Sequence, residues 1–153
     1  MFACGARAAA PEPAKPREET PQITTVCPMY GYRALLPQGA ASADPAYDRA
    51  HYDAAHDDFD AQIAISNNQH RKAARHYLEC AARFRAVATE SEMRFAATAN
   101  ARICYTNAMI AFANAGDLST VGRAELERAA VDDPPLADAI GRMLAAAPSE
   151  CVP

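Results

Sequence analysis

The residues best suited to chemistry are acidic and histidine side chains gathered in one short stretch. They stand three or four positions apart, so a helix would place them on one face: Asp53, His56, Asp57 and Asp60. The carboxylate-x-x-histidine spacing is used in di-iron helical bundles, which need a second copy on another helix. His76 has no carboxylate three residues before it. Two interpretations stay open, a small metal- or ligand-binding bundle and a solvated acidic face near a helix N-terminus.

Five cysteines offer a second kind of chemistry. They include no CxxC pair, which argues against a zinc ribbon or a thioredoxin-type site. Cys80 and Cys104 fall on core-facing positions of neighbouring predicted helices, while Cys27 and Cys151 bracket the helical region. We expect pairing of Cys27 with Cys151 and of Cys80 with Cys104. The alternative is that Cys80 and Cys104 are small buried side chains with free thiols.

Motifs of common enzymes are missing from the sequence. It contains no GxSxG, no glycine-rich phosphate loop and no HExxH. The serines and threonines that stand out lie at the ends of predicted helices, where capping explains them. We therefore expect a protein that is not an enzyme and needs no cofactor.

Length and charge narrow the range of partners. The chain has 153 residues, which suits one domain with a modest core. Its formal net charge is −4, and no basic stripe is present to meet a phosphate backbone, so we expect no nucleic-acid partner. No apolar run approaches the ~20 residues that span a bilayer. A membrane attachment would therefore have to come from a lipid.

The elements that must position these residues are predicted to be helices. Residues 1–22 are rich in Ala, Pro, Glu and Lys and predict a disordered tether. Residues 23–43 are apolar and irregular, and we expect them to pack against the helical body. Residues 44–147 form the helical domain, and residues 148–153 are a short tail. The fold class is all-α, with about five helices in antiparallel hairpins.

Helix ends can be located from capping signals. Asp44-Pro45 predicts the start of a first helix over about 45–66, followed by a second over about 69–88. Thr89-x-x-Glu92 fits a capping box that opens a third helix, which runs to Ala115. A fourth helix is predicted over about 119–131, and Asp133-Pro134 prepares a fifth.

One spacing, a small, a large and a small residue at helical intervals, occurs twice. It is seen at Ala73-x3-Tyr77-x2-Cys80 and, with a Gly-Asp turn before it and a Pro after it, at Gly122-x3-Leu126-x2-Ala129. The segment over about 55–147 thus resembles tetratricopeptide repeats, although the two copies are farther apart than the period of about 34 residues. The resemblance implies helical hairpins that bind another protein. A plain antiparallel helical bundle is the alternative.

The sequence around Cys4 carries a second resemblance. Ala3-Cys4-Gly5 followed by a Pro/Ala-rich linker is similar to the region around the lipidated cysteine of bacterial lipoproteins. This implies a lipid on Cys4 and a periplasmic or outer-membrane-anchored protein. Three residues before Cys4 cannot supply a signal peptide, so such a location requires a start upstream. If Met1 is the true start, we expect a cytoplasmic protein.

Three asparagines at heptad spacing on the third helix are candidate groove residues: Asn100, Asn107 and Asn114. Their amides could donate to and accept from the backbone of a bound peptide. Capping, kinking or exposure to water explains them equally. We therefore expect a non-catalytic interaction or assembly scaffold of the bacterial cell envelope, whose partner is another protein. The alternative is the metal- or ligand-binding bundle at residues 51–60.

Overall fold

The computed structural model describes residues 31–38 and 43–146, with the backbone alone at Met143 and Ala146. All regular structure in these ranges is helical, which confirms the all-α fold class. The elements are α1 (Pro45–Ser66), α2 (His70–Ala88), α3 (Arg94–Asn114), a π-helical turn η1 (Leu118–Gly122), α4 (Arg123–Ala129) and α5 (Pro134–Ala146). The predicted tether (1–22) and tail (148–153) lie outside the described residues.

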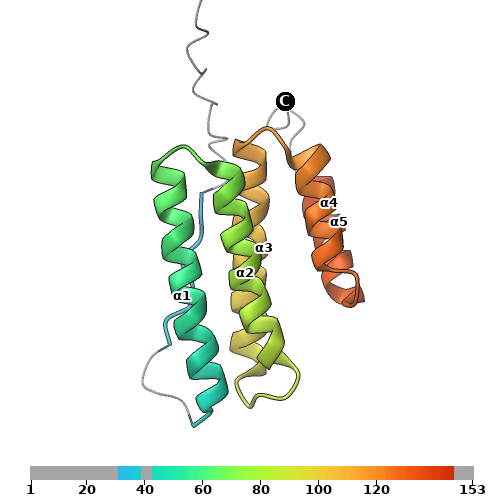
Figure 1. Cartoon of the computed structure of the whole chain (residues 1–153). Helices are drawn as coiled ribbons and strands as arrows, with labels where there is room; N and C mark the ends of the chain where they lie inside the picture. Colours follow the sequence, from blue (N-terminus) through green and yellow to red (C-terminus); the bar gives the residue numbers. More distant parts are fainter. Residues whose placement is uncertain (1–30, 39–42, 147–153) are drawn as a thin grey trace, which may run out of the picture.

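Helices α1, α2 and α3 form a body in which α2 packs against both neighbours, and the α4–α5 hairpin lies beyond α3 (Figure 1). Alanines allow the close approach of α1 and α2, since several are fully buried there: Ala54, Ala61, Ala73 and Ala81. Larger side chains fill the rest of the core: Tyr47, Tyr77, Phe84, Tyr105, Phe112, Leu126 and Ile140. Small residues therefore set the helix spacing, and aromatic rings are the largest of the fully buried side chains.

The start of α1 is fixed by Asp44, as predicted. Its carboxylate accepts hydrogen bonds from the backbone N–H groups of Ala46 (3.0 Å) and Tyr47 (3.1 Å). The hydroxyl of Ser91, between α2 and α3, donates to the same carboxylate. Asp44 thus caps α1 and also connects its N-terminus to the α2–α3 loop.

These bonds make a pH-dependent contribution to stability. The Ser91 hydroxyl, followed by the backbone N–H groups, holds the pKa of Asp44 below its ordinary value of 3.8. A lowered folded-state pKa stabilises the fold above the unfolded pKa, and this gain is lost as pH falls through the folded value. We expect Asp44→Asn, which keeps a capping oxygen, to be less stable than wild type above pH 5. The difference should shrink below pH 4 in urea unfolding from pH 6 to 2.5. If the free energies of unfolding of wild type and Asp44→Asn differ by the same amount at every pH, this role of Asp44 is contradicted.

The predicted start of the third helix is wrong. Thr89 is the C-cap of α2 and does not open a capping box. Helix α3 begins at Arg94, and its N-cap residue, Met93, makes no side-chain capping hydrogen bond. The nearest hydroxyl, on Ser91, accepts from the backbone N–H of Met93 (2.9 Å) and donates to Asp44, 47 residues away in sequence. This contact between α1 and the loop determines the local backbone, and the sequence of the loop alone does not reveal it.

The expected fourth helix is divided and shorter. Residues 118–122 form the π-helical turn η1, and α4 ends at Ala129 rather than near residue 131. The turn follows Gly116, whose φ of 75° is a left-handed conformation that glycine adopts without steric cost. In η1, the backbone N–H of Gly122 donates to the carbonyl of Asp117 (2.8 Å).

Arg85 on α2 connects the body to the α4–α5 hairpin. Its guanidinium donates to the carbonyl oxygen of Ala129 and to the hydroxyl of Tyr105 (3.2 Å). Arg85 Nε also pairs with Asp133 Oδ2, just before α5, at 3.3 Å. A cavity of about 420 Å³ lies beside this cluster, between the body and the start of α5.

Candidate binding groove

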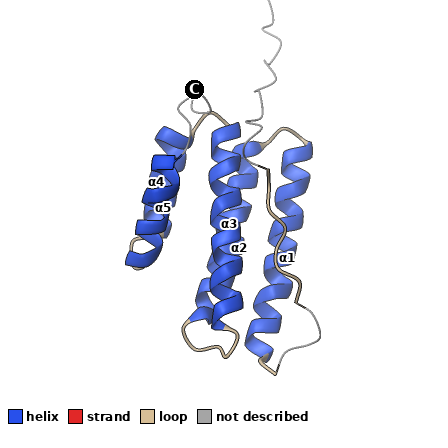
Figure 2. Ribbon diagram, turned by 180° about the vertical axis from the view of Figure 1, so that it is seen from behind, coloured by secondary structure: helices blue, strands red, loops and turns tan. Residues whose placement is uncertain are grey.

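Segment 31–38 lies in a groove whose walls are α1 and α3. Figure 2 shows it as a loop without regular secondary structure that runs along α1, close to the other helices of the body. Tyr32 and Leu35 pack against the hydrophobic core from this position. Residues 31–38 thus pack on the helical body, while residues 23–30 and 39–42 of the stretch expected to pack there lie outside the described residues.

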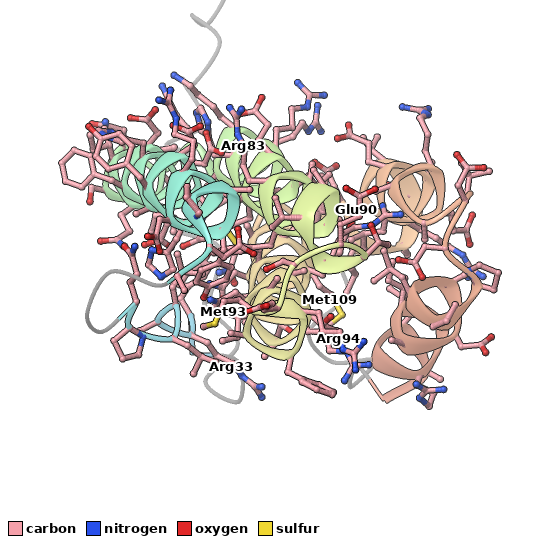
Figure 3. All side chains as sticks on the ribbon, turned by 90° about the horizontal axis from the view of Figure 1, so that it is seen from below. Arg33, Arg83, Glu90, Met93, Arg94 and Met109 are labelled. Carbon is pink, nitrogen blue, oxygen red and sulfur yellow. A yellow bond between two sulfur atoms is a disulfide. The ribbon has the colours of Figure 1, made fainter. Side chains whose placement is uncertain are left out.

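Asn107 on α3 holds the backbone of the segment through both ends of its amide. Its Oδ1 accepts from the N–H of Arg33 (2.8 Å), and its Nδ2 donates to the carbonyl of the same residue (2.8 Å). Such a pair of bonds matches the backbone N–H and C=O of one extended residue and places no requirement on that residue's side chain. The side chain of Arg33 is exposed, and Figure 3 shows it at the edge of the molecule.

Asn100, two turns before Asn107, holds the next part of the segment. Its Oδ1 accepts from the N–H of Leu36 (2.8 Å). The Leu36 carbonyl faces the Nε2 atom of His51 on α1 at 2.9 Å, which places the proton on that nitrogen. Asn100 and Asn107 are both 0% exposed, because the segment covers them. Amides buried to this extent require partners. The segment supplies both partners of Asn107 and the donor to Asn100 Oδ1, and the Tyr47 hydroxyl on α1 accepts from Asn100 Nδ2 at 3.4 Å.

The third asparagine binds a side chain rather than the backbone. Asn114 Nδ2 donates to the hydroxyl of Tyr32 at 3.0 Å. The Tyr32 ring stacks on Tyr77 of α2, with ring centroids 5.8 Å apart. Burial raises the pKa of Tyr32 above 10.0, and the Asn114 bond lowers it in part, so the phenol stays neutral at physiological pH. This end of the groove is therefore an aromatic pocket with one amide donor.

Sequence reasoning selected the three asparagines but not their occupant or the other wall. The chain's own segment 31–38 fills the place predicted for a partner peptide. In the sequence, His51 stands out only as part of the polar stretch 51–60, and Tyr77 only as the large residue of the Ala73-x3-Tyr77-x2-Cys80 spacing. One signal in the sequence could have linked the asparagines to their occupant. Residues 23–43 are apolar, and apolar side chains need a protein surface against which they can be buried.

The predicted metal ligands are dispersed. Among residues 31–38 and 43–146, no group of three or more His, Cys, Asp and Glu side chains is placed to hold a metal ion. The side chains have these environments: Asp53 pairs with Arg49 (3.0 Å), Asp57 with Arg83 (3.2 Å), His56 packs on Tyr52, and Asp60 is exposed. Arg83 lies on the side of the body opposite to Arg33 in Figure 3, so the Asp57 pair lies away from the groove.

Cys80 on α2 and Cys104 on α3 form a disulfide, and both are fully buried. This is the pairing predicted for them. Cys4, Cys27 and Cys151 lie outside the described residues, so the lipid site and the second pairing stay predictions. Across the described ranges, no helix combines the length and the apolar character needed to cross a membrane.

Comparison with protein-family models, with curated proteins and with solved structures gives no match for this chain.

Proposed function

We propose that this protein is a non-catalytic interaction scaffold of tetratricopeptide-like hairpins. Its groove between α1 and α3 takes an extended segment of another protein. The observation that carries the proposal is the way in which segment 31–38 is held. On the segment, Asn107 contacts the backbone N–H and C=O of Arg33, and Asn100 contacts the backbone N–H of Leu36, while the Nδ2 of Asn100 donates to the hydroxyl of Tyr47 on α1. The backbone groups of the segment are common to all extended peptides, so the same asparagines can hold a segment of a partner.

The unfavourable effect of asparagine on helix stability supports a binding role for Asn100 and Asn107. Asparagine is a poor helix former, because its amide competes for backbone groups. Asn100 and Asn107 nevertheless occupy the interior of α3 at sites that are fully buried in the closed groove. An apolar residue would serve the core better, whereas an amide is suited to peptide backbone. Removing the segment re-exposes both amides to water, so the groove tolerates an exchange of occupants.

The disulfide supports the cell envelope as the place of action. Disulfides persist in oxidising compartments and are rare in the cytosol. The pair Cys80–Cys104 therefore favours an exported protein. An acyl chain on Cys4, as in bacterial lipoproteins, would hold the scaffold at a membrane surface.

A full-length chain with an open groove tests the proposal. The double change Arg33→Pro and Leu36→Pro removes the two backbone N–H groups that donate hydrogen bonds to Asn107 and Asn100. Every residue of the groove walls stays unchanged. We expect this open-groove variant to bind a fluorescent peptide of residues 31–38, measured by fluorescence polarisation. Wild type should bind at least tenfold more weakly, because its tethered segment competes at an effective concentration in the mM range.

The matched control adds Asn107→Ala to the open-groove variant. It removes both amide bonds from the groove wall, and we expect peptide affinity to fall at least tenfold. Far-UV circular dichroism checks that each variant keeps its helices. An open-groove variant that is folded but binds no peptide would refute the proposal.

A further inference from the structure

Segment 31–38 meets the groove at every third residue. Tyr32, Leu35 and Gln38 are half-buried, and the five residues between and beside them are exposed. Tyr32 and Leu35 reach the core, and Gln38 Nε2 donates to Asp48 Oδ1 on α1 at 2.8 Å. The burial of this segment thus has a period of three.

The backbone bonds have the same period. The N–H groups held by asparagine belong to Arg33 and Leu36, three residues apart. In a β-strand, residues three apart point to opposite sides, so these two N–H groups could not face one helix. A polyproline II chain has three residues per turn and presents every third residue to the same side. The contacts of segment 31–38 therefore match a polyproline II chain and exclude a flat strand.

The spacing of the asparagines fits this period. Seven residues of α-helix rise about 10.5 Å. Three residues of polyproline II rise about 9.3 Å. One heptad of α3 therefore spans one turn of the bound chain, which runs antiparallel to the helix because Asn107 holds Arg33 and Asn100 holds Leu36. The distance between Asn100 and Asn107 on α3 therefore matches one turn of a polyproline II chain.

We propose that the partner presents a proline-containing polyproline II segment with a defined pattern. Counting Tyr32 as position 0, the pattern is an aromatic residue at 0 and an aliphatic residue at +3. Positions +1 and +4 must carry an N–H, which excludes proline there. Positions +2 and +5 face solvent and accept proline. Segment 31–38 obeys this pattern, since its own proline, Pro37, stands at +5.

This inference rests on the proposed function, and proline placement tests it separately. Four peptides of residues 31–38 are titrated against the full-length open-groove variant: the native sequence, Ala34→Pro, Arg33→Pro and Leu36→Pro. Proline at position 34 restricts Arg33 to extended conformations that the groove already requires. We expect the Ala34→Pro peptide to bind as tightly as the native one or up to about threefold tighter. The Arg33→Pro and Leu36→Pro peptides should bind at least tenfold more weakly.

A further peptide distinguishes the effect of losing the N–H donor from the effect of the backbone restriction that proline imposes. Methylation of the Arg33 amide nitrogen removes the N–H, and the same methylation at Ala34 is its control. We expect only the first to lose affinity. If Ala34→Pro weakens binding as much as Arg33→Pro, the threefold register is wrong, although the groove still binds peptides. If the native peptide does not bind, the proposed function itself fails, and the ligand class with it.

Discussion

Breaking the disulfide between Cys80 and Cys104 should lower the free energy of unfolding by about 3 kcal/mol. The bond joins residues 24 apart in sequence. Closing a loop of this size lowers the conformational entropy of the unfolded chain, which raises the free energy of unfolding by about 3 kcal/mol. For a chain of this length the midpoint of thermal unfolding should fall by roughly 10 °C. Circular dichroism melts with and without a phosphine reductant measure the change.

The same bond affects the groove. Cys80 lies three residues after Tyr77 on α2, and Cys104 lies between Asn100 and Asn107 on α3. The disulfide therefore fixes the position of Tyr77 on α2 relative to Asn100 and Asn107 on α3. The variant Cys80→Ala/Cys104→Ala separates loss of the bond from effects of the reductant, because its melting curve should not respond to reduction. Equal stability of oxidised and reduced wild type would contradict the prediction.

Gly122→Ala should destabilise the protein by about 2–3 kcal/mol. A Cβ at this position would lie 2.6 Å from Cγ and 2.7 Å from Cβ of Phe112, and 3.0 Å from the carbonyl oxygen of Asp117. Phe112 is fully buried on α3, so its ring cannot move away without opening a gap in the core. Urea unfolding followed by far-UV circular dichroism gives the difference.

Gly141 provides the matched control. It lies inside α5, and an added Cβ there would meet no atom within 4 Å. Gly141→Ala should therefore be neutral or stabilise the protein by roughly 0.5–1 kcal/mol, through better helix propensity. If both variants lose stability to the same extent, the cause is not the contact with Phe112.

Local sequence signals predicted much of the fold. Asp44-Pro45 located the start of α1, because an aspartate cap and a proline in the first turn act within four residues. The break before α2 is visible in the same way at Asn68, which adopts a left-handed φ of 58°. Such signals need no knowledge of the rest of the molecule.

The errors occurred where a distant residue decides the backbone. Ser91 is drawn to Asp44, which moves the start of α3 away from the expected capping box. The contact of Gly122 with Phe112 accompanies the π-helical turn in a stretch expected to be one helix. Neither partner can be found from spacing along the chain, because the two residues are brought together only by helix packing.

The candidate groove was predictable in part for the same reason. Heptad spacing places Asn100, Asn107 and Asn114 on one stripe of a helix, whatever that stripe faces. What faces it is a stretch more than 60 residues earlier, and its match to the stripe depends on the rise of two different chain conformations. The idea of a backbone-binding stripe came from residue type, whereas the occupant required the three-dimensional structure.

The last two helices are attached to the body by fewer contacts than those that join α1 to α2 and α2 to α3. The α4–α5 hairpin meets the body through η1, Leu126 and the Arg85 cluster, whereas α2 packs extensively against both α1 and α3. Hydrogen exchange commonly shows that such a peripheral unit opens at a lower free energy than the whole protein. The asparagine stripe, the disulfide and segment 31–38 all belong to the body. We therefore expect local unfolding of the hairpin to leave the groove residues in place.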